Sequence, residues 1–233
     1  MLTFIVPYRA TDQPERAQQL QTFSKAIHKL CPEALVFVME QAGDRPFNRG
    51  ALLNAGITAS RATRETVLCF HDVDLVPGED MLDEYTRPLP KNTVRHIARA
   101  WKRYDSDTYL GGILLMHYTD FCKLNGYPND FWGWGGEDDE LRDRIRRHHM
   151  RIERSEGTIT DLENLTLREK LIKLKVTDAK CKDKTERREW HRRNPSQQGL
   201  RQTNARIVDC REITPTHFHC TVALGAPDSR PDT

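Results

Sequence analysis

The chain has 233 residues, and its 36 lysines and arginines nearly balance 34 aspartates and glutamates, so the formal net charge is +2. This length allows one domain with a sizeable core. No apolar run approaches the roughly 18 residues of a membrane span, and the near-neutral charge argues against a dedicated nucleic-acid-binding protein. Because 30% of the residues are charged, some segment must be strongly polar.

The cysteines and the first residues predict where the protein resides. The six cysteines are scattered, with no C-x-x-C pair: Cys31, Cys69, Cys122, Cys181, Cys210 and Cys220. This pattern predicts free thiols in a reducing compartment. The chain begins with an apolar strand-like run, Met1-Leu-Thr-Phe-Ile-Val-Pro, in place of a signal peptide. We therefore expect a cytoplasmic protein, or a lumenal one only if the chain has been trimmed.

The first hundred residues predict alternating strands and helices. Leu2–Pro7, Ala34–Met39 and Thr66–Phe70 are continuously apolar, as in parallel strands that are covered on both faces. A helix is predicted after the first strand, with Asp12 as N-cap, and another over Asn48–Ala62. The alternation predicts an α/β fold with a mostly parallel central sheet and helices on both faces. Ligands of such sheets bind beyond the carboxyl ends of the strands.

The rest of the chain divides into a continuing core and a polar segment. Further strands are predicted around Trp101 and over Tyr109–Met116, then a helix from about Glu137 to Arg147 and a last strand over His217–Leu224. The region Thr166–Arg206 has many charged residues and few apolar ones.

These boundaries predict a single domain over residues 1–233. Residues 1–154 would form the ligand-binding and catalytic core, 155–206 a polar lid over the ligand, and 207–233 the final strand and tail. A polar, loosely packed segment suits a lid that orders on binding.

Asp72-Val73-Asp74 follows the third apolar strand. Carboxylates two residues apart at a strand end can project into the ligand crevice, and they can bind a hard divalent cation that neutralises a diphosphate. The alternative interpretation of this D-x-D motif is a solvated loop with two acids.

The segment from Trp132 to Glu140, Trp-Gly-Trp-Gly-Gly-Glu-Asp-Asp-Glu, is the most unusual in the chain. Aromatic faces stack on sugar rings, glycines allow close approach of the backbone, and a carboxylate can accept a proton from an attacking hydroxyl. Acids also suit the start of a helix. A helix start explains the acids but not the alternating tryptophans and glycines.

Two arginines are candidates for binding phosphate. Arg49 lies at a predicted helix start, where anions bind well, and Arg9 follows the first strand. Each arginine alone is equally consistent with an ordinary surface charge.

Seven motifs, in this order, resemble the β-1,4-galactosyltransferase family, glycosyltransferase family 7, and cover roughly residues 2–154. They are Val6-Pro-Tyr-Arg9, Gln41-Ala-Gly-Asp44, Phe47-Asn-Arg49 with Leu-Leu-Asn54, Asp72-Val-Asp74-Leu-Val-Pro77, Tyr109-Leu-Gly-Gly112, Asn125-Gly-Tyr-Pro-Asn129 and Trp132-Gly-Trp-Gly-Gly-Glu-Asp-Asp139. The resemblance implies a GT-A fold and an inverting, manganese-dependent hexosyltransferase. The donor would be a UDP-sugar, usually UDP-galactose, and the acceptor a hydroxyl of a glycan or glycoconjugate.

The resemblance also implies roles for individual residues. Asp138 would be the general base, Glu137 would face the sugars, and Trp134 would act at a mobile hinge. Asp74 would bind the metal, and Tyr109 favours galactose over N-acetylgalactosamine. Transfer of N-acetylgalactosamine or glucose in place of galactose is the alternative. The donor site would contain Pro7, Arg9, Phe47, Arg49, Asp72, Val73, Tyr109 and Gly112.

The sequence departs from the family at the metal site. Family members complete that site with histidine, as H-x-H or Met-x-x-His, after the acid cluster, whereas Ser155–Lys175 contains neither histidine nor methionine. Asp161, Glu163 or His191 could replace it, and Asp74, Asp72 and His191 form the predicted ligand set. His217 and His219, on the last strand, are expected to be structural.

Two other functions are consistent with the sequence. The chain could be a non-catalytic protein that binds nucleotide sugars or carbohydrates on the same scaffold. It could also bind RNA through Arg142–Arg154 and Lys170–Arg206, although interspersed glutamates and scarce aromatic residues disfavour this. RNA could still be an acceptor.

Overall fold

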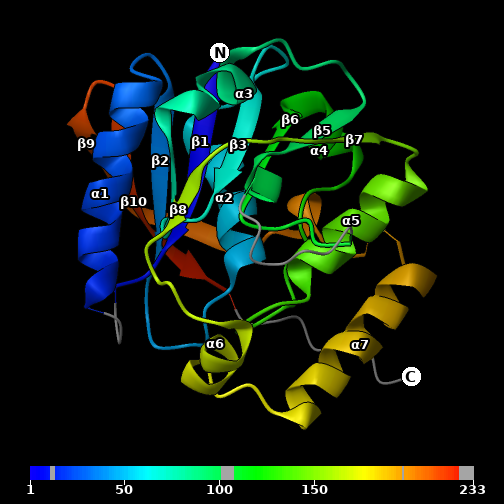
Figure 1. The fold of residues 1–233 in the computed structure, drawn as a ribbon. Helices are drawn as coiled ribbons and strands as arrows, with labels where there is room; N and C mark the ends of the chain where they lie inside the picture. The colour runs from blue at the N-terminus through cyan, green and yellow to red at the C-terminus, as the bar shows by residue number, and fades with distance from the viewer. Residues whose placement is uncertain (11–13, 101–107, 196, 226–233) are drawn as a thin grey trace.

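The structure, a computed structural model, describes residues 1–10, 14–100, 108–195 and 197–225 (Figure 1). The predicted N-cap Asp12 and the predicted strand around Trp101 lie outside these residues.

Among the described residues, a central sheet has the strand order β7-β5-β6-β3-β1-β2-β10-β9, and a smaller sheet pairs β4 with β8. The strands are β1 (Leu2–Tyr8), β2 (Leu35–Gln41), β3 (Val67–His71), β4 (Leu75–Pro77), β5 (Thr93–His96), β6 (Ile113–His117), β7 (Arg151–Arg154), β8 (Ile159–Asp161), β9 (Ala205–Thr214) and β10 (His217–Leu224). Strands β3, β1, β2 and β10 are parallel neighbours, whereas β6 and β9 pair antiparallel with theirs. The sheet is therefore mostly parallel with antiparallel flanks.

Helices cover both faces of this sheet (Figure 1). They are α1 (Glu15–Leu30), α2 (Arg49–Ser60), α3 (Leu82–Thr86), α4 (Tyr118–Lys123), α5 (Glu137–Arg147), α6 (Leu167–Lys173) and α7 (Asp178–Arg193), with short 3₁₀ turns at Glu79–Met81, Ile97–Ala100 and Leu200–Gln202. Because successive residues of a strand face opposite sides, Phe4 of β1 packs with Phe23 of α1, and Ile5 packs with Leu52 of α2. The predicted α/β class and GT-A architecture are confirmed.

The predicted helix Glu137–Arg147 and strand His217–Leu224 have the predicted bounds. Strands β7, β8 and β9 were not predicted individually, since they are short or mostly polar and exposed. The polar segment that was predicted only as a lid contains the helices α6 and α7. Helix α7 is only weakly amphipathic, because its own charged residues lie on all its sides.

The prediction of six free thiols is wrong. Cys210 and Cys220 lie opposite each other on the antiparallel strands β9 and β10 and form a disulfide. A pairing that depends on strand register is not visible in cysteine spacing alone. Disulfides persist in oxidising compartments. None of the helices in the described residues combines the length and apolar character needed to cross a bilayer.

The buried His96 predicts acid sensitivity. Its Nε2 lies 3.0 Å from the carbonyl oxygen of Gly111, and burial lowers the pKa of its ring to about 4. Because the unfolded chain takes up this proton near pH 6.5, stability that is present above pH 6.5 is lost as the pH falls towards 4, by up to about 3 kcal/mol.

We therefore expect the melting temperature to fall between pH 6.5 and 4, and to fall less steeply in His96→Gln. The slope is reduced and not abolished, since burial also lowers the pKa of His71 to about 4. Thermal unfolding across this pH range checks the prediction, and identical slopes for the two proteins would contradict it.

Candidate active site

A cavity of about 470 Å³ opens where β1 and β3 end and where α2 and α5 begin, with α6 along its edge. Its position beyond the carboxyl ends of parallel strands is the expected ligand position in an α/β fold. The structure brings most of the predicted site residues together in its wall: Pro7, Arg9, Phe47, Arg49, Asp72, Val73, Asp74, Tyr109, Trp134, Glu137 and Asp138.

Arg49 is the centre of the acidic part of the cavity. Its Nε donates to Asp72 Oδ1 at 2.7 Å, its Nη1 donates to Asp138 Oδ1 at 2.8 Å, and Nη1 lies 3.7 Å from Glu137 Oε1. Burial lowers the pKa of the guanidinium, but the carboxylates of Asp138 and Asp72 outweigh burial and raise it well above its usual value. Arg49 therefore holds three acids from two different elements at one point.

The local sequence explains why Arg49 is placed there. The side chain of Asn48 accepts a hydrogen bond from the backbone N–H of Ala51 and caps α2, which makes Arg49 the first residue of the helix. Asn48 is itself fixed, because its backbone N–H donates to Gln41 Oε1 at 2.8 Å. A Cβ at Gly50 would lie 2.4 Å from the carbonyl oxygen of Pro128, so only glycine allows this approach.

Asp138 has the environment of a carboxylate that can take up a proton. It lies in the first turn of α5, and a Cβ at Gly111 would come within 2.4 Å of its Oδ2, so Gly111 makes room for it. Burial raises the pKa of Asp138 well above its usual value, Arg49 opposes this, and the negative charges of Glu137 and Asp72 add to it. A raised pKa brings a carboxylate closer to the operating pH of a general base.

Two residues of the acidic part of the cavity each carry a buried polar atom without a partner. Within the described residues, Arg49 Nη2 and Glu137 Oε2 are buried and make no hydrogen bond. Such atoms are costly to leave unpaired. Both residues line the cavity beside Asp138, so this part of the site keeps hydrogen-bonding capacity that the chain itself does not use.

The Trp-Gly-Trp-Gly-Gly segment forms the rim of the cavity. Gly133, Gly135 and Gly136 have φ values of +84°, +82° and +100°, and a Cβ at Gly136 would overlap the ring of Phe131. This backbone, which L residues rarely adopt, leaves Trp134 37% exposed with the Lys184 ammonium 5.1 Å from its ring centroid. Trp134 is thus available to a ligand entering the cavity.

The predicted base- and phosphate-binding residues line a second part of the wall. The Arg9 guanidinium lies 5.7 Å from the ring centroid of Phe47, and Pro7 lines the cavity beside them. Tyr109 also lines the cavity and packs edge-on against His96, with 5.4 Å between ring centroids. These aromatic and basic groups suit a ligand with a flat base and a charged phosphate.

Asp74 lies among cations. Its Oδ2 accepts from Arg16 Nη1 at 3.1 Å and lies 3.8 Å from Lys170 Nζ of α6. Glu163 binds the same two cations, at 2.9 Å from Arg16 Nη2 and 2.9 Å from Lys170 Nζ. The backbone brings these acids together, because the N–H of Leu162 donates to the carbonyl oxygen of Asp74 at 2.8 Å. Burial raises the pKa of Asp74, but Lys170 and Arg16 outweigh burial and lower it.

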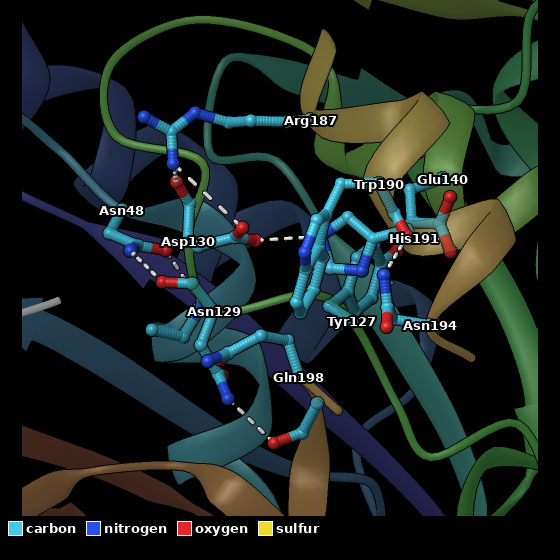
Figure 2. A network of polar contacts seen from close by, with 12 residues as sticks. Asn48, Tyr127, Asn129, Asp130, Glu140, Arg187, Trp190, His191, Asn194 and Gln198 are labelled. Carbon is cyan, nitrogen blue, oxygen red and sulfur yellow. Dashed lines mark hydrogen bonds and ion pairs between the residues drawn. The ribbon is translucent and has the colours of Figure 1, made fainter. Parts of the chain in front are cut away.

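His191, predicted as a metal ligand with Asp74, lies elsewhere. Figure 2 shows it against Asp130, whose Oδ1 is 2.9 Å from its Nε2, and its ring stacks on Phe131. Arg187, also on α7, donates to the carbonyl oxygen of Asp130 at 3.0 Å. His191 is 1% exposed and anchors α7 to the loop before α5. This correction follows from packing that the sequence does not reveal.

Gly112, predicted in the donor site, does not line the cavity. Its carbonyl oxygen accepts the N–H of Asp72 at 2.9 Å, so it supports the D-x-D segment from behind. His219 binds Glu40, at 2.7 Å, and His217 lies near His28, both away from the cavity wall.

Sequence reasoning missed Arg16, Lys170 and Lys180, which also line the cavity. Arg16 lies at the start of α1. Lys170 and Lys180 come from the polar segment, where they are two basic residues among many. No local motif distinguishes them. Only the departure of residues 155–175 from the family pattern signalled unusual chemistry here.

The fold and the composition of this cavity define a glycosyltransferase-like protein of the GT-A class. Family models match residues 1–86, described as the N-terminal region of glycosyl transferase group 7, and residues 92–168, described as the N-terminal domain of galactosyltransferase. The chain belongs to the β-1,4-galactosyltransferase family, glycosyltransferase family 7.

Individual relatives agree with this membership. β-1,4-Galactosyltransferase 4 of Rattus norvegicus is 39% identical over 120 residues, 51% of this chain and 35% of that protein. β-1,4-Galactosyltransferase 3 of Homo sapiens is 34% identical over 159 residues, 64% of this chain and 38% of that protein. The chain thus spans little more than a third of the length of these curated relatives.

Two solved structures are similar over nearly the whole chain. The catalytic domain of Drosophila β1,4-galactosyltransferase 7 in complex with xylobiose has a TM-score of 0.77 and 26% identity, with coverage of 97% of this chain and 94% of that one. A mutant of the same enzyme, in complex with manganese, UDP-Gal and xylobiose, has a TM-score of 0.75, 25% identity and the same coverage.

The prediction of a cytoplasmic location is wrong. The matched relatives are β-1,4-galactosyltransferases, which are Golgi lumenal enzymes. The prediction rested on the first residues and on the expectation of free thiols. The sequence covers only part of those relatives, and Cys210 and Cys220 form a disulfide.

Proposed function

We propose that the protein is an inverting hexosyltransferase that moves a sugar from a UDP-sugar donor to a hydroxyl of a glycan or glycoconjugate. The observation that carries the proposal is the meeting of Asp138, Arg49 and Asp72 in one cavity whose rim is Trp134. The galactosyltransferase relatives, and the UDP-Gal bound by the Drosophila enzyme, support galactose as the sugar.

Asp138 supplies the base in this proposal. Its carboxylate accepts the proton of the acceptor hydroxyl as that oxygen attacks the anomeric carbon, and the bond to the UDP oxygen breaks on the opposite face. Arg49 orients Asp138, because the guanidinium donates to Asp138 Oδ1. Burial raises the pKa of that carboxyl, and the charge of Arg49 opposes the rise. Trp134 and Tyr109 line the cavity. Aromatic rings commonly pack on the faces of sugars, so these two side chains would contact the donor or acceptor sugar.

The residues predicted to bind manganese do not come together in the structure. No group of three or more histidine, cysteine, aspartate or glutamate side chains that could hold a metal occurs in the parts of the chain that are described. Asp74 and Glu163 offer hard oxygens, but both are already paired with Arg16 and Lys170. Asp72 binds Arg49, and His191 binds Asp130. The proposed mechanism therefore uses only side chains of the protein.

A transfer screen tests the proposal. The purified protein is incubated with each UDP-sugar and mixed glycan acceptors, and UDP release and product mass are measured. We expect turnover with UDP-galactose above that with UDP-N-acetylgalactosamine or UDP-glucose. Binding of UDP-galactose without release of UDP for any acceptor would favour a non-catalytic binding protein.

A further inference from the structure

We propose that Arg16 and Lys170 bind the donor diphosphate directly, in the position where this family places a divalent cation, so that the protein binds its donor without metal. This proposal rests on the proposed function and names the groups that hold the charged part of its donor.

The two cations line the part of the cavity in which a diphosphate would have to bind. Arg16 begins α1 after the carboxyl end of β1, Lys170 projects from α6, and both line the cavity together with Asp74. Each side chain is 17% exposed, so each is largely withdrawn from bulk water but still reached from the cavity. A guanidinium and an ammonium side by side are the usual phosphate-binding groups of proteins.

The two acids in this cluster hold the cations in place. Asp74 and Glu163 make four ion pairs with Arg16 and Lys170, at 2.9–3.8 Å. Gln19 Oε1, 3.0 Å from Arg16 Nη1, adds a further restraint. Asp74 and Glu163 are therefore positioning residues for the two basic side chains.

The charges of the cluster disfavour a divalent cation. The charges of the two carboxylates balance those of the two buried cations. A third cation lies close to them, because Lys173 Nζ is 3.5 Å from Glu163 Oε1. An inserted dication would have to break the four ion pairs and would then face two like charges at short range. A diphosphate, in contrast, can accept hydrogen bonds from the two cations while their acids remain in place.

The distribution of charge along the cavity also orients the donor. At one end, Arg49 pairs with three carboxylates, whereas at the other end Arg16 and Lys170 pair with two. The diphosphate is favoured at the Arg16–Lys170 end. The transferred sugar is then directed towards Asp138.

Binding of UDP tests the proposal. Isothermal titration calorimetry measures the dissociation constant of UDP for the wild type in EDTA and in manganese chloride. We expect the two values to agree within about twofold, and we expect Lys170→Ala and Arg16→Ala each to raise the dissociation constant in EDTA by about 10- to 100-fold, as for a lost charged hydrogen bond.

Lys173→Ala is the matched control. Lys173 lies on the same helix and near the same Glu163, but its Nζ donates to Glu15 at 2.7 Å and it does not line the cavity. Its dissociation constant should stay within about twofold of the wild type. Lys170→Arg, which keeps the charge, should restore most of the affinity that Lys170→Ala loses, and unliganded melting temperatures show whether each variant folds.

The outcomes separate this inference from the proposed function. Binding of UDP that requires manganese, or that Lys170→Ala leaves unchanged, overturns the cation-pair proposal and leaves the transferase proposal standing. If neither UDP nor any UDP-sugar binds in either buffer, both proposals fail.

Discussion

Replacement of Asp138 by asparagine should lower kcat for sugar transfer by about 10²–10⁴-fold, the usual contribution of a positioned general base. The amide keeps the size of the side chain. Its oxygen can still accept the hydrogen bond from Arg49 Nη1, which in the wild type lies 2.8 Å from Asp138 Oδ1. It cannot take up the proton of the acceptor hydroxyl. The affinity for UDP should change little, because the diphosphate is assigned to the opposite end of the cavity.

Steady-state kinetics with UDP-galactose and a responsive acceptor check this result. Asp83→Asn on α3, where the side chain is 79% exposed, is the control for the same chemical change away from the cavity. Because burial raises the pKa of Asp138, the wild-type rate should also fall on the acid side as this carboxyl becomes protonated, and Asp138→Asn should lose that acid limb. A normal rate in Asp138→Asn would remove Asp138 as the base.

Replacement of Arg49 by methionine should destabilise the fold by about 3–5 kcal/mol, because it leaves buried carboxylates without their counter-charge. Asp72, Glu137 and Asp138 would all lose their shared partner. Their pKa values are already raised, with burial as the first cause, and Arg49 is the main group that lowers them. In the variant the three pKa values rise further.

This change in pKa predicts a pH dependence with a definite sign. A carboxyl whose folded pKa lies above its unfolded value stabilises the fold below the unfolded pKa, and this contribution is lost as the pH rises through the folded pKa. The difference in melting temperature between wild type and Arg49→Met should therefore be largest near pH 7 and shrink towards pH 5. Urea or thermal unfolding at several pH values measures it.

Arg64→Met provides the control for loss of an arginine, since Arg64 is exposed. It should leave the stability within about 0.5 kcal/mol of the wild type. A difference between Arg49→Met and wild type that does not depend on pH would contradict the assigned role of Arg49 as the shared counter-ion of three acids.

Local sequence was sufficient to predict many of the residues that line the cavity. Asp72-Val73-Asp74 follows an apolar strand, and Glu137 and Asp138 begin a helix after a glycine-rich turn, as expected. These predictions succeeded because a strand end or helix start determines where its own next residues lie. They also rested on motifs that are short and continuous.

Contacts between distant segments were not predictable in this way. His191 is a plausible ligand from its residue type, but the packing of α7 places it on Asp130. Arg16 and Glu163 are 147 residues apart and meet at 2.9 Å. Cys210 and Cys220 pair because β9 and β10 set their register. None of these partners is marked by composition or by spacing.

The sequence by itself therefore determined the α/β class, the family and most of the predicted residues that line the cavity, because apolar periodicity and short motifs act through local backbone geometry. Only the tertiary structure decided which charges meet. The energy of an ion pair depends on distance and on burial, and both are set by the packing of elements far apart in the chain. At Asp74 this packing supplies two cationic partners, Arg16 and Lys170.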